Sequence, residues 1–342
     1  MKCITNLALC VCMALLVSCG RQEPSEPQEN LPLLKVGHVG HDHQLALYVA
    51  ALEGSQLESK RSVFLKEVKK REIYDLIDHG KPIARLRLIK VGGGSRMPAA
   101  MERGEIDLGL GGVAAVAFFI DKGNDFKIVF PLQTDGDMLV MRQDFTADHW
   151  ESFVQQVKAQ PRALKIGYKA PVAVAKLIFE RALKAEGVPI AKNPGMEEAK
   201  VELVNLQGAG NLIPTLANGA IDGFVVNQPY ASMAVDKKVG KIVCDLSTLP
   251  PAGKWQKHPC CCVATTKTVL NKHRAIVKSF LNVLCAATAS IHANQETAIQ
   301  HAAAWTKNPL AVEQTSVPTV NYMSYPSPKW MEGMATWAAM MN

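Results

Sequence analysis

The chain has 342 residues, enough for two ordinary domains, and its 38 Lys and Arg against 31 Asp and Glu give a formal net charge of +7 at pH 7. That charge is mild for this length, no block of basic residues runs along the sequence, and only 6% of the residues are aromatic. Composition therefore excludes a strongly basic, base-stacking surface, and no nucleic acid is expected among the partners.

The first segment in chain order, residues 1–18, is a predicted secretory signal peptide. Lys2 precedes an apolar run from Ile4 to Val17 that is shorter than the roughly 20 apolar residues of a membrane span. The following Leu16-Val-Ser-Cys19 resembles the bacterial lipobox, in which cleavage precedes a cysteine that receives a diacylglyceryl group. The resemblance implies a lipoprotein that carries palmitate and is lipidated at Cys19. An ordinary signal peptide with an incidental cysteine is the alternative.

Residues 19–33 are then the lipid anchor and a polar, proline-bearing tether. The expected location is the cell envelope, on the extracytoplasmic side of a bacterial membrane, with the membrane as a partner through the N-terminal lipid.

Apolar runs alternate with helical periodicity along the rest of the chain. Strands are expected at residues 35–40, 85–91, 106–110, 127–132, 137–142, 164–167, 201–206, 221–226 and 240–244. Helices are expected at residues 44–53, 96–103, 113–122, 148–158, 171–186, 211–218, 228–237 and 274–294, with an amphipathic helix over 330–341. The charged insert from Gln56 to Lys81 is expected to form one or two surface helices. Alternation of strands and helices predicts an α/β protein.

An internal repeat is the most informative pattern. Met-Glu-Arg-Gly-Glu-Ile-Asp at 101–107 and Leu-Ala-Asn-Gly-Ala-Ile-Asp at 216–222 each end a helix and lead into an apolar strand. The glycine of each copy is expected at the position after the helix, where glycine adopts a positive φ at little cost in free energy. Apolar strands of this kind fit a parallel sheet covered by helices on both faces.

These residues, with Lys35-Val-Gly-His-Val-Gly40, resemble the nitrate/sulfonate/taurine class of ABC-transporter substrate-binding proteins over about residues 34–300. The resemblance implies a periplasmic-binding-protein-like fold with two α/β lobes, a ligand cleft and two interlobe crossovers, near 137–142 and 245–264. Lobe 1 is expected to hold residues 34–138 and 255–342, and lobe 2 residues 139–254.

The function that the resemblance implies is capture of a small-molecule ligand in the cleft and its delivery to the permease subunits of an ABC importer. No enzymatic activity, no catalytic residue and no cofactor are expected. A sensor ectodomain with a receptor partner is an alternative that the sequence leaves open.

Ligand contacts are expected where loops follow the carboxyl ends of the strands. The candidate ligand-binding residues are His41, Asp42, His43, Gly94, Ser95, Gly112, Val113, Ala170, Pro171, Val172, Asn227, Gln228, Tyr230 and Cys260. The group from His41 to His43 suggests a ligand with mixed donors and acceptors.

Two motifs near these loops could indicate a dinucleotide site or a metal site. Gly109-Leu-Gly-Gly-Val-Ala114 has the spacing of a dinucleotide fingerprint, but no acidic residue ends the next strand, so close backbone approach is expected instead. The histidines at 38, 41 and 43 offer metal-ligand atoms, but His38 lies within a strand, and a ligand-contacting or hydrogen-bonded loop is preferred over a metal site.

The third motif is His-Pro-Cys-Cys-Cys-Val-Ala at 258–264. Loss of the signal and lipidation of Cys19 leave five other cysteines, an odd set without a disulfide framework: Cys244, Cys260, Cys261, Cys262 and Cys285. On a regular strand Cys260 and Cys262 face one side and Cys261 the other, so the three are not expected to converge on one ion.

The run also resembles the cysteine cluster of the thiamine-pyrimidine precursor synthases, which use iron and a bound pyridoxal cofactor, but the last cysteine of that cluster is missing here. An enzyme of that type is a second alternative.

Overall fold

The computed structural model describes residues 31–57, 61–192, 196 and 198–341. The predicted signal peptide, Cys19 and most of the tether lie outside the described residues.

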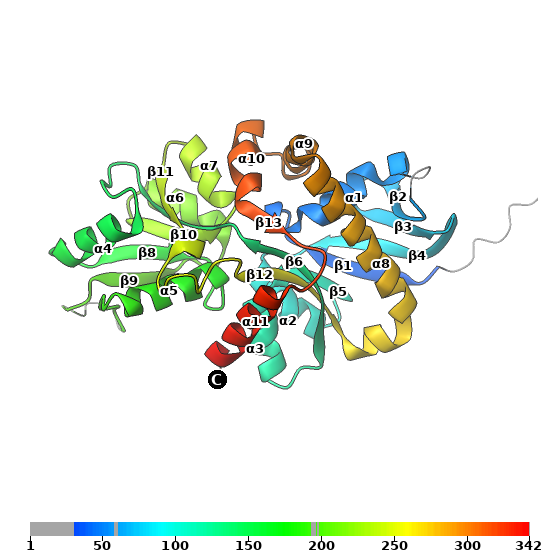
Figure 1. The fold of residues 1–342 in the computed structure, drawn as a ribbon, viewed down its shortest axis with the longest axis horizontal. Helices are drawn as coiled ribbons and strands as arrows, with labels where there is room; N and C mark the ends of the chain where they lie inside the picture. Colours follow the sequence, from blue (N-terminus) through cyan, green and yellow to red (C-terminus); the bar gives the residue numbers. More distant parts are fainter. Residues whose placement is uncertain (1–30, 58–60, 193–195, 197, 342) are drawn as a thin grey trace, which may run out of the picture. The chain divides into compact units, whose positions relative to one another are not determined.

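The larger of two sheets has eight strands in the order β13-β6-β12-β5-β1-β4-β3-β2 (Figure 1). They are β1 Leu33–His38, β2 Val63–Lys69, β3 Ile73–Asp78, β4 Lys81–Lys90, β5 Leu108–Gly112, β6 Phe126–Asp135, β12 Pro259–Thr266 and β13 Val320–Tyr322. Strands β4, β1 and β5 are parallel, and β12 runs antiparallel between β5 and β6. The carboxyl ends of β1, β4 and β5 therefore meet at one edge.

The smaller sheet has five strands in the order β11-β7-β10-β8-β9. They are β7 Asp137–Arg142, β8 Leu164–Tyr168, β9 Val201–Asn205, β10 Gly223–Asn227 and β11 Gly240–Asp245. Strand β8 is parallel to β9 and β10, whereas β7 is antiparallel to its neighbours.

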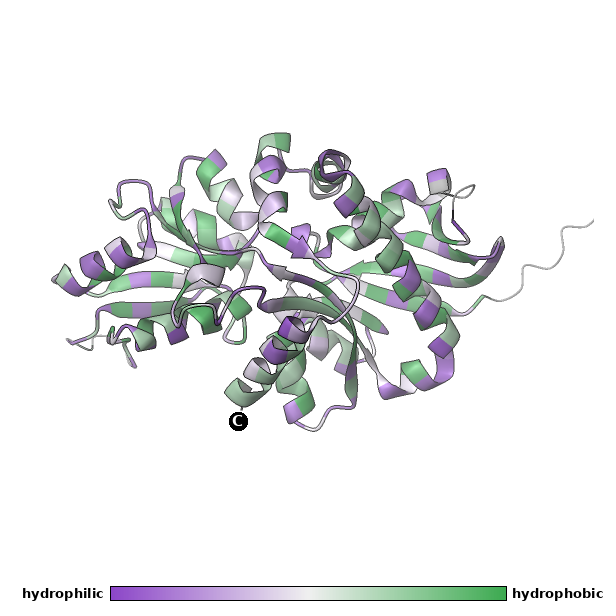
Figure 2. Ribbon diagram, in the orientation of Figure 1, coloured by the Kyte–Doolittle hydropathy of each residue, from purple (hydrophilic) through white to green (hydrophobic). Residues whose placement is uncertain are grey.

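Helices cover both faces of the larger sheet. Figure 1 shows α1, α8 and α9 on one side and α2, α3 and α11 on the other. The bounds of these helices are α1 Leu45–Glu53, α2 Met97–Glu102, α3 Val113–Asp121, α8 Lys267–Ala293, α9 Gln295–Thr306 and α11 Pro328–Met341. A further helix, α10 Leu310–Ser316, follows α9. The short 3₁₀ turns are η1 Asp42–Gln44, η2 Gly54–Leu57, η3 Gly94–Arg96, η4 Ala209–Asn211, η5 Leu246–Thr248 and η6 Val317–Thr319. Hydrophobic residues run through the strands in Figure 2, beside hydrophilic ones on the outer strands, as expected for a sheet packed against helices.

The smaller sheet is likewise covered on both faces. Helices α4 Trp150–Ala159 and α5 Val174–Ala185 pack their aromatic residues together, with Phe153 in contact with Trp150 and Phe179. Helices α6 Leu212–Ala217 and α7 Tyr230–Asp236 share a separate apolar cluster with Phe224 of β10.

The chain passes between the sheets twice. It leaves β6 at Asp135 and enters β7 at Asp137, and it returns between the end of β11 at Asp245 and the start of β12 at Pro259. The predicted α/β fold, with two lobes and two crossovers, is confirmed; the assignment of residues 34–138 with 255–342 to one lobe and 139–254 to the other stays a prediction.

The internal repeat has a structural reason. The carboxylate of Asp107 accepts the backbone N–H of Lys35 at 2.7 Å, and that of Asp222 accepts the N–H of Lys165 at 2.8 Å. The backbone N–H of each aspartate donates in turn to the carbonyl of the same lysine. Each repeat aspartate therefore ties its own strand to the parallel neighbour, β1 or β8. The preceding Gly104 and Gly219 have φ of 68° and 75°, which confirms the expected helix ends.

The charged insert departs from the prediction. Residues 63–78 form the antiparallel pair β2–β3 rather than surface helices. Alternating burial of Tyr74 and Leu76 puts one face of β3 in the core, and His79 and Gly80, both with positive φ, form the turn into β4. The expectation of helices was wrong because the charged residues lie on the exposed face of β2–β3, while Tyr74 and Leu76, two positions apart, carry the strand signal.

Among the described residues, one helix is long and apolar enough to cross a membrane, namely α8. Its buried residues Val277, Phe280, Leu284 and Ile291 follow helical spacing and face the core beside α1. Figure 2 shows hydrophilic and hydrophobic residues mixed along its length, as in a helix with one face on a core.

Candidate functional site

Two glycine-containing loops occupy matching places in the two sheets. Gly93 follows β4 and precedes η3, and Gly208 follows β9 and precedes η4. Their backbone angles are nearly identical, with φ 155° and ψ 149° at Gly93 and φ 155° and ψ 147° at Gly208. Residues with a Cβ rarely adopt this conformation, so glycine is required at both positions.

A cavity of about 120 Å³ lies between these loops. It is lined by Val39, His41, Gly92, Gly93, Gly94, Ser95, Arg96, Lys169, Ala170, Gln207, Gly208, Ala209, Gly210 and Tyr230. The lining comes from loops after β1, β4, β8, β9 and β10, which is where open α/β sheets bind ligands. We call this cavity the cleft.

Five of the sequence-predicted residues line the cleft: His41, Gly94, Ser95, Ala170 and Tyr230. Whether they bind a ligand stays a prediction. Sequence reasoning missed Arg96, Lys169 and the loop 207–210. The repeat held the signal for that loop, because Gly93 precedes Asp107 by the same 14 residues that separate Gly208 from Asp222.

Cationic side chains dominate the polar part of the cleft. Arg96 Nη2 donates to the carbonyl of Gln207 at 3.2 Å and so joins the two glycine loops. Lys169 Nζ donates to the side-chain oxygen of Asn227. Burial is the main cause that holds the pKa of His41 well below its usual value, and the neighbouring His43 and Lys169 act in the same direction. His41 is therefore neutral, and its buried Nδ1 has no hydrogen-bond partner among the described residues.

Asp42 lies in the interior rather than in the cleft wall. Ser316 Oγ donates to its carboxylate, and the Tyr322 hydroxyl donates to its carbonyl at 3.1 Å. Burial first, and then the adjacent Glu313, raise the pKa of Asp42 well above its usual value. The carboxyl group thus faces α10, and the loop 41–43 does not present its three polar side chains together.

His43 points instead at the cysteine run. Its Nδ1 lies 3.4 Å from Cys260 Sγ and 3.9 Å from Cys261 Sγ, and all three residues are buried. The expectation that Cys260 and Cys261 face opposite sides was wrong. The pairing of β12 with β6 shifts register on both sides of Cys261, and such a bulge places consecutive side chains on one side.

The two thiols of this cluster differ in acidity. A hydrogen bond from Cys260 is the main cause that lowers the pKa of Cys261 to about 6, and His43 acts in the same direction against burial. The same hydrogen bond, together with burial, raises the pKa of Cys260 well above its usual value. Cys261 is accordingly the more acidic of the two thiols. Burial raises the pKa of Cys262 well above its usual value, and the side chain packs in the core.

The remaining predicted residues lie outside the cleft lining. Gly112, Val113, Pro171, Val172, Asn227 and Gln228 are not among the residues that form its wall. The Gln228 side chain accepts hydrogen bonds from the backbone and hydroxyl of Ser232 within α7. The expected close approach at 109–114 is present, because a Cβ on Gly111 would lie 2.8 Å from the carbonyl oxygen of Gly94.

The crossovers between the sheets are joined by a buried ion pair. His258 Nε2 lies 3.1 Å from the carboxylate of Asp137, and His258 Nδ1 lies 2.8 Å from the carbonyl of Trp255. Burial opposes the charge on each partner, yet the pairing raises the pKa of His258 and lowers the pKa of Asp137. The pairing therefore favours the charged form of both groups, and His258 lies two residues before the cysteine run.

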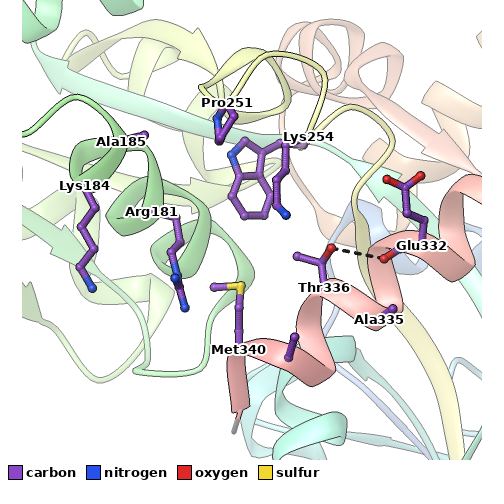
Figure 3. A pocket seen from close by; sticks show the side chains of 11 residues that line it. Arg181, Lys184, Ala185, Pro251, Lys254, Glu332, Ala335, Thr336 and Met340 are labelled. Atoms are coloured by element: carbon purple, nitrogen blue, oxygen red, sulfur yellow. Dashed lines mark hydrogen bonds between the residues drawn. The ribbon is translucent and has the colours of Figure 1, made fainter.

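A larger groove of about 740 Å³ lies elsewhere, between α5, the second crossover and α11 (Figure 3). Arg181 and Lys184 of α5 and Lys254 of the crossover border it, and Thr336 donates to the carbonyl of Glu332 within α11. None of the sequence-predicted residues lines this groove. It lies away from the parallel strand ends that form the cleft.

Comparison with known proteins agrees with this architecture. The fold is that of periplasmic binding proteins, in which two α/β lobes enclose a cleft. A family model described as the NMT1-like family matches residues 34–307, and the chain belongs to that family. An uncharacterized protein of Methanocaldococcus jannaschii is 33% identical over 134 residues, which are 39% of this chain and 90% of that protein.

Two solved structures share the fold at low sequence identity. The ligand-binding component of an ABC-type import system from Staphylococcus aureus, solved with zinc bound, has a TM-score of 0.70 at 14% identity and covers 90% of this chain and 91% of that chain. The alkanesulfonate-binding protein SsuA from Xanthomonas axonopodis pv. citri, bound to MOPS, has a TM-score of 0.65 at 14% identity, with 93% and 92% covered.

Proposed function

We propose that this protein is the solute-binding component of an ABC importer, which captures a small molecule in the cleft and delivers it to permease subunits. The observation that carries the proposal is the matched pair of glycine loops, one from each sheet, that line a single cavity with Arg96 and Lys169. Glycine lets the backbone approach a ligand closely from both sides.

The mechanism is a hinge between the two sheets. Because residues of both sheets line the cleft, a ligand that touches both stabilises the closed arrangement relative to the open one. The two crossovers are where the backbone turns. The Arg96 hydrogen bond to Gln207 is a contact of the closed arrangement that the ligand reinforces.

The lining favours a small anion or a polar molecule rich in acceptors. Among the described residues, the cleft lining contains Arg96 and Lys169 but no carboxylate, so a cationic ligand would meet electrostatic repulsion there. A volume of about 120 Å³ corresponds to about four water molecules at roughly 30 Å³ each. We favour this class over the sequence-based expectation of a ligand with mixed donors and acceptors, because Asp42 is not among the lining residues.

We extend the proposal to location and anchoring. An extracytoplasmic lipoprotein attached through Cys19 and tethered by residues 19–33 would hold the cleft near the permease. The proposed role requires no turnover, and the sequence-level alternatives of an enzyme and a sensor ectodomain make different predictions. An enzyme would convert its ligand, and a sensor would bind a receptor rather than a permease.

The direct test is thermal unfolding of the full chain in a panel of small oxyanions, including nitrate, sulfate, methanesulfonate and short carboxylates. A true ligand at 100 times its Kd should stabilise the protein by about 2.7 kcal/mol. Lys169→Met should abolish this stabilisation, because it removes a cation from the cleft wall. Lys254→Met is the matched control, since Lys254 borders the larger groove. Ligand stabilisation that survives Lys169→Met and is lost in Lys254→Met would move the solute site to the groove.

A further inference from the structure

The strongest feature that the proposed function leaves unused is the buried group of His43, Cys260 and Cys261. Their ligand-forming atoms, one imidazole nitrogen and two sulfurs, all lie within 4.8 Å of one another. His43 comes from η1, after β1, while the cysteines open β12 at the end of the second crossover. Each of the three residues is at most 5% exposed.

The spacing of these donor atoms matches a coordination sphere. A metal ion bound at about 2.3 Å to sulfur and about 2.0–2.1 Å to nitrogen holds the two donors about 3.6–3.8 Å apart at tetrahedral or trigonal angles. The nitrogen–sulfur separations here are 3.4 and 3.9 Å. An ion would thus need only small side-chain shifts. The register shifts on both sides of Cys261 turn the two sulfurs to the same side.

The orientation of His43 is an independent second observation. Its Nε2 lies 3.2 Å from the carbonyl oxygen of Gly136, which can only accept, so Nε2 is protonated and Nδ1 is the ring nitrogen that faces the sulfurs. Metal-binding histidines commonly donate their other ring N–H to a carbonyl or carboxylate in this way. Gly136 is needed for the approach, because its φ is 77° and a Cβ there would lie 2.7 Å from Nε2.

The donor set selects the class of ion. Two sulfurs and one imidazole without a carboxylate favour soft, thiophilic ions over Mg²⁺, Ca²⁺ or Mn²⁺, which prefer oxygen. Thiolates suit Cu⁺ and Zn²⁺, which both have filled d shells and impose little geometry of their own. Three donors suffice for Cu⁺, whereas Zn²⁺ would take a fourth ligand.

We propose that His43, Cys260 and Cys261 form a binding site for one thiophilic d¹⁰ cation, Cu⁺ or Zn²⁺, below the floor of the cleft. The His41 ring, which lines the cleft, lies 5.4 Å from the His43 ring, so the ion would be held next to the solute without occupying its cavity. Coordination by both sulfurs releases the remaining thiol protons to the buffer. The site does not depend on the proposed transport role, because it rests on the cluster alone.

The test is metal titration of the full chain under reducing, anaerobic conditions, with Cys3, Cys10, Cys12 and Cys19 replaced by serine so that the thiols near the N-terminus do not contribute. Cu⁺ and Zn²⁺ are titrated separately against chromophoric chelators, and X-ray absorption of the loaded protein identifies the donors. We expect one ion per chain, with sulfur scatterers at about 2.2–2.3 Å and at least one nitrogen scatterer at about 2.0 Å.

Variants separate a built site from adventitious thiol binding. Cys261→Ser and His43→Gln should each weaken binding by about 100-fold or more. Cys285→Ser should leave it unchanged, because Cys285 lies outside the cluster and hydrogen-bonds Ser324. Thermal unfolding without metal shows whether each variant is folded. The X-ray absorption spectrum is measured on protein in which His43, Cys260 and Cys261 are intact, so that result does not depend on any variant folding.

Three results would overturn the site: less than one tightly held ion per chain, binding that Cys285→Ser abolishes and Cys261→Ser does not, or a preference for Fe²⁺ or Mn²⁺ over both d¹⁰ ions.

Discussion

At the scale of single residues, the two repeat aspartates show that the same motif can be stabilised by different numbers of hydrogen bonds. Asp107 and Asp222 make the same backbone bonds to Lys35 and Lys165. Asp222 also accepts three hydrogen bonds from arginine, two from Arg162 at 2.6 and 2.8 Å and one from Arg142 at 2.7 Å. The same backbone clamp is thus reinforced by charge in the smaller sheet.

We predict that Asp222→Asn lowers the free energy of unfolding by about 2 kcal/mol and Asp107→Asn by about 1 kcal/mol, as measured by urea denaturation at neutral pH. Asparagine keeps an acceptor for the backbone N–H, so the difference between the variants reports the arginine contacts. Equal losses in the two variants would contradict this account.

The same pair predicts a pH dependence. Burial alone would raise the pKa of Asp222, but the Arg162 hydrogen bonds and the Lys165 N–H lower it below its usual value of 3.8. The stabilisation is therefore fully present above pH 3.8 and is lost as pH falls through the lower folded-state pKa. The wild-type and Asp222→Asn unfolding curves should converge in that acidic range. A gap that stays constant there would show that the carboxylate charge is not involved.

At the scale of elements, the packing of β5 depends on glycine. A Cβ on Gly111 would lie 2.8 Å from the Gly94 carbonyl oxygen and 2.8 Å from Cβ of Met97, whereas a Cβ on Gly112 would find nothing closer than 3.9 Å. Gly111 is therefore in close contact with Gly94 and Met97 whereas Gly112 has no such contact, although both glycines pair with β12.

We predict that Gly111→Ala destabilises the protein by about 2 kcal/mol or more, because the clash is with backbone and cannot relax by a rotamer change. Gly112→Ala should cost about 1 kcal/mol or less, mainly as a poorer residue before α3. The measurement is the urea midpoint at constant m-value. Similar costs at both positions would show that β5 is not held against η3 and α2 as described.

The elements also show what sequence could and could not predict. Apolar runs located every strand of the smaller sheet and β1, β4, β5 and β6 of the larger one, and the glycine-isoleucine-aspartate repeat located the matching helix ends, because those signals are local. The β2–β3 pair was missed although the alternation of Tyr74 with Leu76 and the turn at His79-Gly80 carried the pattern.

The side of the strand on which Cys261 lies was missed for a different reason. A bulge depends on pairing with β6, and no local pattern encodes it. Asp42 was likewise assigned to the cleft because its partners, Ser316 and Glu313, are about 270 residues away along the chain. Contacts of that range come from the tertiary fold alone.

At the scale of the whole molecule, the proposed hinge and the cysteine run both lie at the crossovers. His258 lies immediately before β12, and its partner Asp137 begins β7, so one ion pair joins the two passages of the chain between the sheets. Their side chains are each 2% exposed. A lone charge left behind by removal of either partner would be buried without compensation.

We predict that His258→Ala lowers the free energy of unfolding by about 3 kcal/mol, since it leaves the Asp137 carboxylate buried and unpaired. His79→Ala is the matched control: that histidine pairs with Asp78 at the surface with its side chain 83% exposed, and its removal should cost less than about 1 kcal/mol. In a double-mutant cycle with Asp137→Asn, the two changes should couple by at least about 1 kcal/mol. Additive losses would mean that the residues stabilise the crossovers separately, and the ion pair would then not be what joins the two passages of the chain.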